Sequence, residues 1–72
     1  MPDDTTSIQR TASRLRKARK EHGLTQVEVA DKAGISETYY AQIERAEKNP
    51  TTSVFVSIIK AIGVPSKDIL GK

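Results

Sequence analysis

The segment from residue 25 to residue 45 constrains the fold most, because only residues 34–36 separate its two short helical stretches. Thr25 and Glu28 have the spacing of a capping box, which predicts that the first of these helices begins at Thr25. Gly34 can take the positive φ that ends this helix, and Ser36 can cap the next one. Two helices joined by so short a turn must cross steeply.

The flanking segments also have helical periodicity. The apolar residues before the tight turn recur at helical spacing and are Ile8, Ala12, Leu15 and Ala18. Gly23 follows them in the position expected just past a helix end. After the turn, Asn49-Pro50 predicts a loop, and Thr51 can cap a further helix that ends at Gly63. The apolar stripe of that helix is Phe55, Ile58, Ile59 and Ile62.

These elements predict a single all-α domain. Pro65-Ser66 starts a last short helical turn, so we expect a compact bundle of four to five short helices. A chain of 72 residues can form one compact domain and is too short for two. Residues 1–6 are predicted to be a disordered lead-in, and residues 7–72 are predicted to form the domain. The sequence has no cysteine, so packing or a partner must supply the stability of so small a fold.

Composition excludes several classes of function. The N-terminus is acidic and polar, and no apolar run approaches membrane-spanning length, so we expect a soluble, cytoplasmic protein without a membrane partner. The glycines are isolated, and the lone His22 has no neighbour that would complete a metal site or a catalytic pair. We therefore expect no enzyme activity, no cofactor, no metal and no small-molecule ligand.

The net charge is only +3, but six cations and no acid lie within residues 10–20. A basic concentration of this kind suits a polyanion, although a solvated helix face has the same composition. On charge alone, the solvated face is the favoured interpretation.

The second helix of the 25–45 segment has two distinct faces on a helical wheel. Tyr40 and Ile43 cluster on one side and are predicted to be core. The opposite side is polar, with Glu37 and Tyr39 at its margins, and consists of Thr38, Ala41, Gln42 and Arg45. A polar face without bulky apolar residues, near a helix N-terminus, suits the major groove of DNA.

The stretch "RLRKARKEHGLTQVEVADKAGISETYYAQIERAEKNPT" resembles the phage-repressor and Cro-like helix-turn-helix family, and the resemblance extends from about Ile8 to Leu70. The residues that carry it are Arg19, Gly23, Leu24, Gln26, Ala30, Gly34, Ile43, Glu44 and Asn49-Pro50. Within that family, "TYYAQIERAEKNPT" is most similar to the controller proteins of restriction-modification systems. The resemblance implies a transcriptional regulator that binds double-stranded DNA sequence-specifically, with the helix-turn-helix proper at about residues 25–45.

The resemblance also implies roles for individual residues. The expected base-contacting residues are Glu37, Thr38 and Gln42. The expected contacts to the DNA backbone are Gln26, Arg45, Lys48 and Asn49, to which we add Tyr39 from its place at the margin of the polar face. Arg19 and Glu44 are expected to form a partly buried structural ion pair. Glu37 is unusual near phosphates, and it either accepts from cytosine N4 or pairs within the protein.

Three residues depart from the family pattern. Ala46 replaces the usual glycine, which predicts a strained or differently shaped turn. Ala18 is smaller than the usual leucine, and Val27 is apolar where the family is acidic or polar.

One small module makes too few contacts for tight specific binding, so we expect a homodimer on a palindromic operator. The predicted dimer interface is Val54, Ile58, Val64, Ile69 and Leu70. Two alternatives stay open at this point. The first is an antitoxin-like protein-interaction subunit that also binds DNA. The second, a membrane-surface peptide, would need larger apolar residues opposite the charges.

Overall fold

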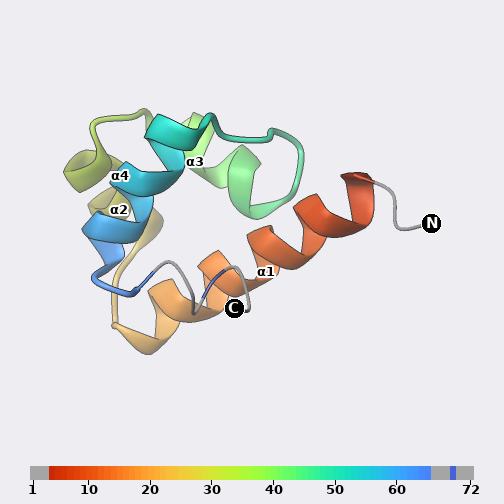
Figure 1. Cartoon of the computed structure of the whole chain (residues 1–72). Coiled ribbons are helices and arrows are strands. Elements are labelled where there is room, and N and C mark those ends of the chain that lie inside the picture. Colours follow the sequence, from red (N-terminus) through yellow and green to blue (C-terminus); the bar gives the residue numbers. More distant parts are fainter. Residues whose placement is uncertain (1–3, 66–68, 70–72) are drawn as a thin grey trace.

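The computed structural model describes residues 4–65 and residue 69. In this part of the chain the regular secondary structure is all α-helix, without strands (Figure 1). The four helices are α1 (Asp4–Glu21), α2 (Gln26–Ala33), α3 (Glu37–Glu44) and α4 (Thr52–Ile62). The predicted all-α fold is confirmed. Of the predicted last turn only Pro65 and Ile69 are described, so that turn lies largely outside the described residues.

Helix α1 begins earlier than the sequence suggested. It starts at Asp4, so residues 4–6 belong to its first turn and not to a disordered lead-in. Extending an existing helix is easy, because each added residue gains one backbone hydrogen bond once the helix is nucleated. Residues 1–3 lie outside the described residues.

The predicted caps around the tight turn are confirmed. The Thr25 hydroxyl accepts from the Glu28 amide at 3.1 Å, and the Thr25 amide donates to the Glu28 carboxylate at 2.8 Å. Gly34 ends α2 with φ at 75°, and the Ser36 hydroxyl then accepts from the Tyr39 amide at 3.0 Å. These local bonds fix where α2 ends and α3 begins, and therefore how the two helices cross.

Helix α4 is bounded as predicted. The Thr51 hydroxyl accepts from the Val54 amide at 3.2 Å, and Gly63 follows the helix with φ at 91°. α4 packs against α2 and α1, while α3 packs against α2 and α1 (Figure 1).

The core lies where the four helices meet. Its largest fully buried side chains are Tyr40, Leu15, Ile43, Ile58, Ile69 and Val29. Tyr40 has no exposed surface, whereas its neighbour Tyr39 is half-buried. The two adjacent tyrosines therefore differ in environment, and Tyr40 is a core residue as predicted.

Candidate nucleic-acid interface

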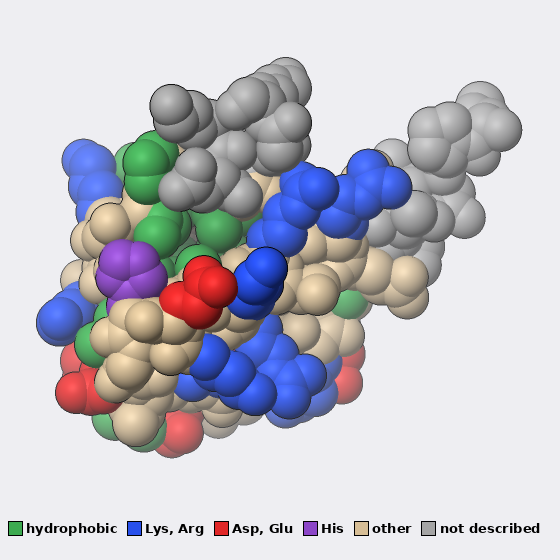
Figure 2. All heavy atoms as spheres, turned by 90° about the horizontal axis from the view of Figure 1, so that it is seen from below, with side chains coloured by type: hydrophobic (Ala, Val, Ile, Leu, Met, Phe, Trp, Pro, Cys, Tyr) green, Lys and Arg blue, Asp and Glu red, His purple; other side chains and the backbone are tan. Residues whose placement is uncertain are grey.

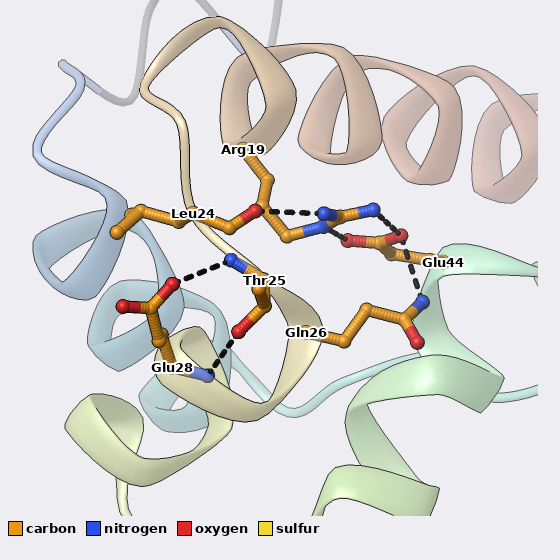
Figure 3. Close-up of polar contacts among 6 residues, drawn as sticks. All are labelled: Arg19, Leu24, Thr25, Gln26, Glu28 and Glu44. Atoms are coloured by element: carbon orange, nitrogen blue, oxygen red, sulfur yellow. Dashed lines mark hydrogen bonds and ion pairs between the residues drawn. The ribbon is translucent and has the colours of Figure 1, made fainter.

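A buried ion pair joins α1 to the end of α3. The Arg19 guanidinium donates from Nε to Glu44 Oε2 at 2.6 Å and from Nη2 to Glu44 Oε1 at 3.1 Å (Figure 3). Its third donor, Nη1, reaches the Leu24 carbonyl at 2.8 Å. The Arg19 and Glu44 side chains retain 11% and 2% of their exposed surface. The structure thus contains the ion pair that the resemblance implied.

Gln26 connects α2 to the same pair. Its Nε2 donates to Glu44 Oε1 at 3.1 Å, so Glu44 contacts residues from both α1 and α2 (Figure 3). The sequence predicts only a DNA phosphate as the partner of Gln26 and does not indicate this contact. A carboxamide nitrogen carries two N–H donors, so the second remains for a phosphate at the N-terminus of α2. Glu44 thereby orients Gln26.

The ionisation of this cluster is set by competing effects. Burial alone raises the pKa of Glu44, but the hydrogen bonds from Arg19, the nearby Tyr40 hydroxyl and the hydrogen bond from Gln26 together outweigh burial and hold that pKa below its usual value. The hydrogen bond to Glu44 raises the pKa of Arg19, so the pair favours the charged form of both residues. Burial raises the pKa of the Tyr40 hydroxyl strongly, and the nearby Glu44 carboxylate raises it further. This hydroxyl makes no hydrogen bond of good geometry among the described residues.

The outward face of α3 agrees with the helical wheel. Glu37 and Thr38 are exposed, while Tyr39 and Gln42 are half-buried. Thr38 and Gln42 stand four residues apart and share one face of the helix. Within the described residues Glu37 forms no ion pair.

The connection from α3 to α4 carries the remaining expected DNA-backbone contacts. Arg45, Lys48 and Asn49 are all exposed. Arg45 donates from Nε to Glu47 Oε2 at 2.9 Å and from Nη2 to Glu47 Oε1 at 3.1 Å. The hydrogen bonds from Arg45 lower the pKa of Glu47. Glu47 is not among the residues expected at the site, although a carboxylate two residues after an arginine in a short turn can form such a pair.

The departure at Ala46 has a structural consequence. Ala46 has φ at 60°, in the left-handed region that favours glycine. Its amide donates to the Ile43 carbonyl at 3.1 Å, and the next amide, of Glu47, donates to the Gln42 carbonyl at 2.8 Å. The turn therefore keeps the geometry suited to glycine, and the alanine is strained. The other two departures from the family pattern differ in their environment: Val27 is 44% exposed, and Ala18 is buried.

We expect the substitution Ala46→Gly to stabilise the protein. Relief of about 1–2 kcal/mol of left-handed strain exceeds the roughly 0.4–1 kcal/mol that glycine costs through the unfolded chain. The net gain should be about 0.5–1 kcal/mol, measured by denaturant unfolding. Ala41→Gly, inside α3, is the matched control and should lose about 1 kcal/mol. A less stable Ala46→Gly variant would contradict the strain.

Two of the five residues predicted for the dimer interface offer no surface in the single chain. Ile58 and Ile69 are 0% and 1% exposed in the single chain, so neither can contact a partner. Ile58 belongs to the apolar stripe of α4 that faces the core. Val54 and Val64 are half-buried, Val56 is 43% exposed, and Leu70 lies outside the described residues.

The cations of residues 10–20 lie mostly on the outside of α1. Figure 2 looks on to this helix from below and shows Lys and Arg side chains over it. The exposed ones are Arg10, Arg16, Lys17 and Lys20. Arg14 is half-buried and donates to the Ile69 carbonyl at 3.0 Å. This is the arrangement of a solvated helix face with one cation used in packing.

The part of the chain that the structure describes contains neither a membrane-spanning helix nor a cluster of metal ligands. None of its helices has the length and apolar character needed to cross a bilayer. No group of three or more acidic or histidine side chains there has a geometry that would hold a metal ion.

Comparison with known proteins gives relatives whose names describe a repressor, a gene regulator and a controller protein. The chain is 41% identical over 59 residues to the immunity repressor protein of Bacillus phage phi105, which covers 82% of this chain and 41% of that protein. The chain therefore spans less than half the length of that relative. The clp gene regulator ClgR from C. glutamicum superposes with a TM-score of 0.86 at 26% identity, covering 97% of this chain and 87% of that one. The wild-type restriction-modification controller protein C.Esp1396I gives a TM-score of 0.84 at 26% identity, covering 97% and 90%.

The helix-turn-helix family profile matches residues 15–69, which include the Arg19–Glu44 pair, the tight turn and α4. This match extends over most of the chain and agrees with the crossing of α2 and α3. The chain belongs to the helix-turn-helix family.

Proposed function

We propose that this chain is a transcriptional regulator that binds double-stranded DNA sequence-specifically, as a homodimer on a palindromic operator in the cytoplasm. The observation that carries the proposal is the crossing of α2 and α3, which leaves the polar face of α3 outward within a helix-turn-helix family chain. The similarity to a phage repressor and to a restriction-modification controller supports one of these two regulatory settings.

In this proposal α3 enters the major groove. Thr38 and Gln42 read base edges from one face of the helix, and Glu37 accepts from a cytosine N4 at the exposed start of α3. The backbone contacts come from both ends of the motif and are made by Gln26, Tyr39, Arg45, Lys48 and Asn49. Backbone contacts position the protein, whereas base contacts specify the sequence.

Two variants should distinguish a contact to the DNA backbone from a contact to a base. Lys48→Ala should weaken binding equally on all sequences and reduce the log–log salt slope by about 1, because a phosphate contact releases counterions. Gln42→Ala should instead change the preferred base at one position, at a cost of about 1–3 kcal/mol. Lys60→Ala on the exposed side of α4 is the control for loss of one charge. If Lys48→Ala altered the preferred sequence and Gln42→Ala did not, the orientation of α3 on DNA would be wrong.

Selection of bound duplexes from a random pool tests the proposal as a whole. A palindromic consensus is expected, with half-sites about 10 bp apart or a multiple of that. Sedimentation should show dimers, to which Val54, Val56 and Val64 offer the apolar surface. A pool without enrichment would contradict sequence-specific binding, and a monomer that binds half-sites as well as palindromes would contradict the dimer.

A further inference from the structure

The pair between Arg45 and Glu47 occupies donors that the proposed function assigns to DNA. Two parallel hydrogen bonds join the guanidinium to the carboxylate, at 2.9 Å and 3.1 Å. Both side chains are more than half exposed, at 56% and 52%. They follow the end of α3 directly and lie in the same connection as Lys48 and Asn49.

The backbone holds Glu47 in this place. Its amide donates to the Gln42 carbonyl at 2.8 Å, so the residue folds back on the last turn of α3 and does not extend into the loop. Arg45 is tied in turn by its amide to the Ala41 carbonyl at 3.1 Å. The two charges are therefore kept close together by the turn that Ala46 makes.

A carboxylate and a phosphate present similar paired oxygens to the guanidinium fork. A phosphate that approaches Arg45 must therefore displace Glu47 or share the fork with it. Exposed ion pairs of this kind are weak, so the exchange is easy and Arg45 is not blocked. The displaced carboxylate stays near the anionic backbone, however, and repels it.

We infer that Glu47 competes with the DNA phosphate for Arg45 and so limits the affinity of this helix-turn-helix for DNA. The inference rests on the proposed function. Phosphates carry no sequence information, so the limit applies to operator and non-operator DNA alike. Glu47 thereby sets the strength of binding without changing which sequence is preferred.

The same geometry would also fit the opposite role for Glu47, in which it helps Arg45 to bind the phosphate. If Glu47 instead positioned the Arg45 fork for the phosphate, removing the carboxylate would weaken DNA binding. The two roles predict changes of opposite sign in one substitution, so a single measurement separates them.

The test compares Glu47→Gln with Glu21→Gln in the full chain, on a selected operator duplex and on a duplex of random sequence. Glu21 is exposed and ends α1, and this C-terminal end of α1 lies away from the α3–α4 connection (Figure 1). Both variants change the charge equally. We expect Glu47→Gln to bind both duplexes about two- to fivefold more tightly per protomer, with a salt slope steeper by about 1. Equal affinities in the two variants, or weaker binding by Glu47→Gln, would overturn the inference.

Arg45→Ala completes the test as a double-mutant cycle. We expect this substitution to reduce affinity less in the wild-type chain, where Glu47 competes for the guanidinium, than in the Glu47→Gln background. Equal losses in the two backgrounds would overturn the competition. Failure of the wild-type chain to bind any DNA would contradict the proposed function itself, whereas normal binding with no effect of Glu47→Gln would overturn this inference alone.

Discussion

Alanine in place of Glu44 is expected to lower the free energy of unfolding by about 3–5 kcal/mol, because breaking a buried ion pair leaves an uncompensated charge in the interior. Arg19 is 9% exposed and would keep only its bond to the Leu24 carbonyl. Gln26 would also lose the acceptor that orients it. A small domain has about 5–15 kcal/mol of stability, so the loss is a large share of the total.

A double variant distinguishes loss of the pair from loss of one partner. Replacing both members by apolar residues, Arg19→Met with Glu44→Leu, removes the two charges together and should cost less than Glu44→Ala alone. Denaturant unfolding monitored by circular dichroism measures the free energy of unfolding of the double variant and of Glu44→Ala. If the double variant lost the sum of the losses measured for Arg19→Met alone and Glu44→Leu alone, the ion pair would contribute nothing as a unit. A loss below about 1 kcal/mol in Glu44→Ala would show that the buried Arg19 charge is easily solvated.

The stability that Glu44 supplies should depend on pH in a defined direction. Its pKa in the folded protein lies below the usual 4.5, so the unfolded chain takes up the proton more readily than the folded one. The contribution is therefore complete above about pH 4.5 and is lost as the pH falls through the lower folded value. We expect the difference in unfolding free energy between the wild type and Glu44→Gln to be constant near neutral pH and to narrow in acid. A difference that widened in acid would contradict this sign.

The parts of the fold that could be predicted are those that depend on local chemistry. A capping hydroxyl bonds an amide three residues ahead, so Thr25, Ser36 and Thr51 mark helix starts without any tertiary information. Gly34 and Gly63 mark helix ends for the same reason, since only the local φ is involved. The separation of the faces of α3 also follows from periodicity alone.

The parts that could not be predicted depend on how the helices meet. The bond from Gln26 to Glu44 joins residues that lie 18 positions apart, and no spacing rule indicates it. A stripe of four apolar residues does not show whether Ile58 faces the core or a partner, and the packing of α4 against α2 buries it in the single chain. The spacing of Arg45 and Glu47 indicates that the two side chains can meet, but only the left-handed turn at Ala46 brings them together. The residues proposed to contact DNA stay predictions until the variants are measured.

The two adjacent tyrosines should respond to substitution in opposite ways. Tyr40 fills the angle between α2 and α3 and has no exposed surface, so Tyr40→Ala should cost about 3–5 kcal/mol of stability. That loss would unfold the domain or nearly so, and DNA binding would disappear with the fold.

Tyr40→Phe separates the ring from its hydroxyl. Because the buried hydroxyl lies near the Glu44 carboxylate but makes no hydrogen bond of good geometry among the described residues, we expect this variant to melt close to the temperature of the wild type. A stable, folded Tyr40→Ala would show that the ring does not support the α2–α3 crossing.

Tyr39→Phe tests the half-exposed neighbour. It removes one hydroxyl at the margin of the outward face of α3, so the melting temperature should stay almost unchanged. If that hydroxyl donates to a phosphate, affinity should fall by about 0.5–3 kcal/mol, towards the upper value because the acceptor is charged. The fall should be similar on all operators, since a phosphate contact does not read sequence. A thermal melt and a binding titration on both tyrosine variants give the answer, and unchanged affinity in Tyr39→Phe would assign Tyr39 to packing at the rim of α3.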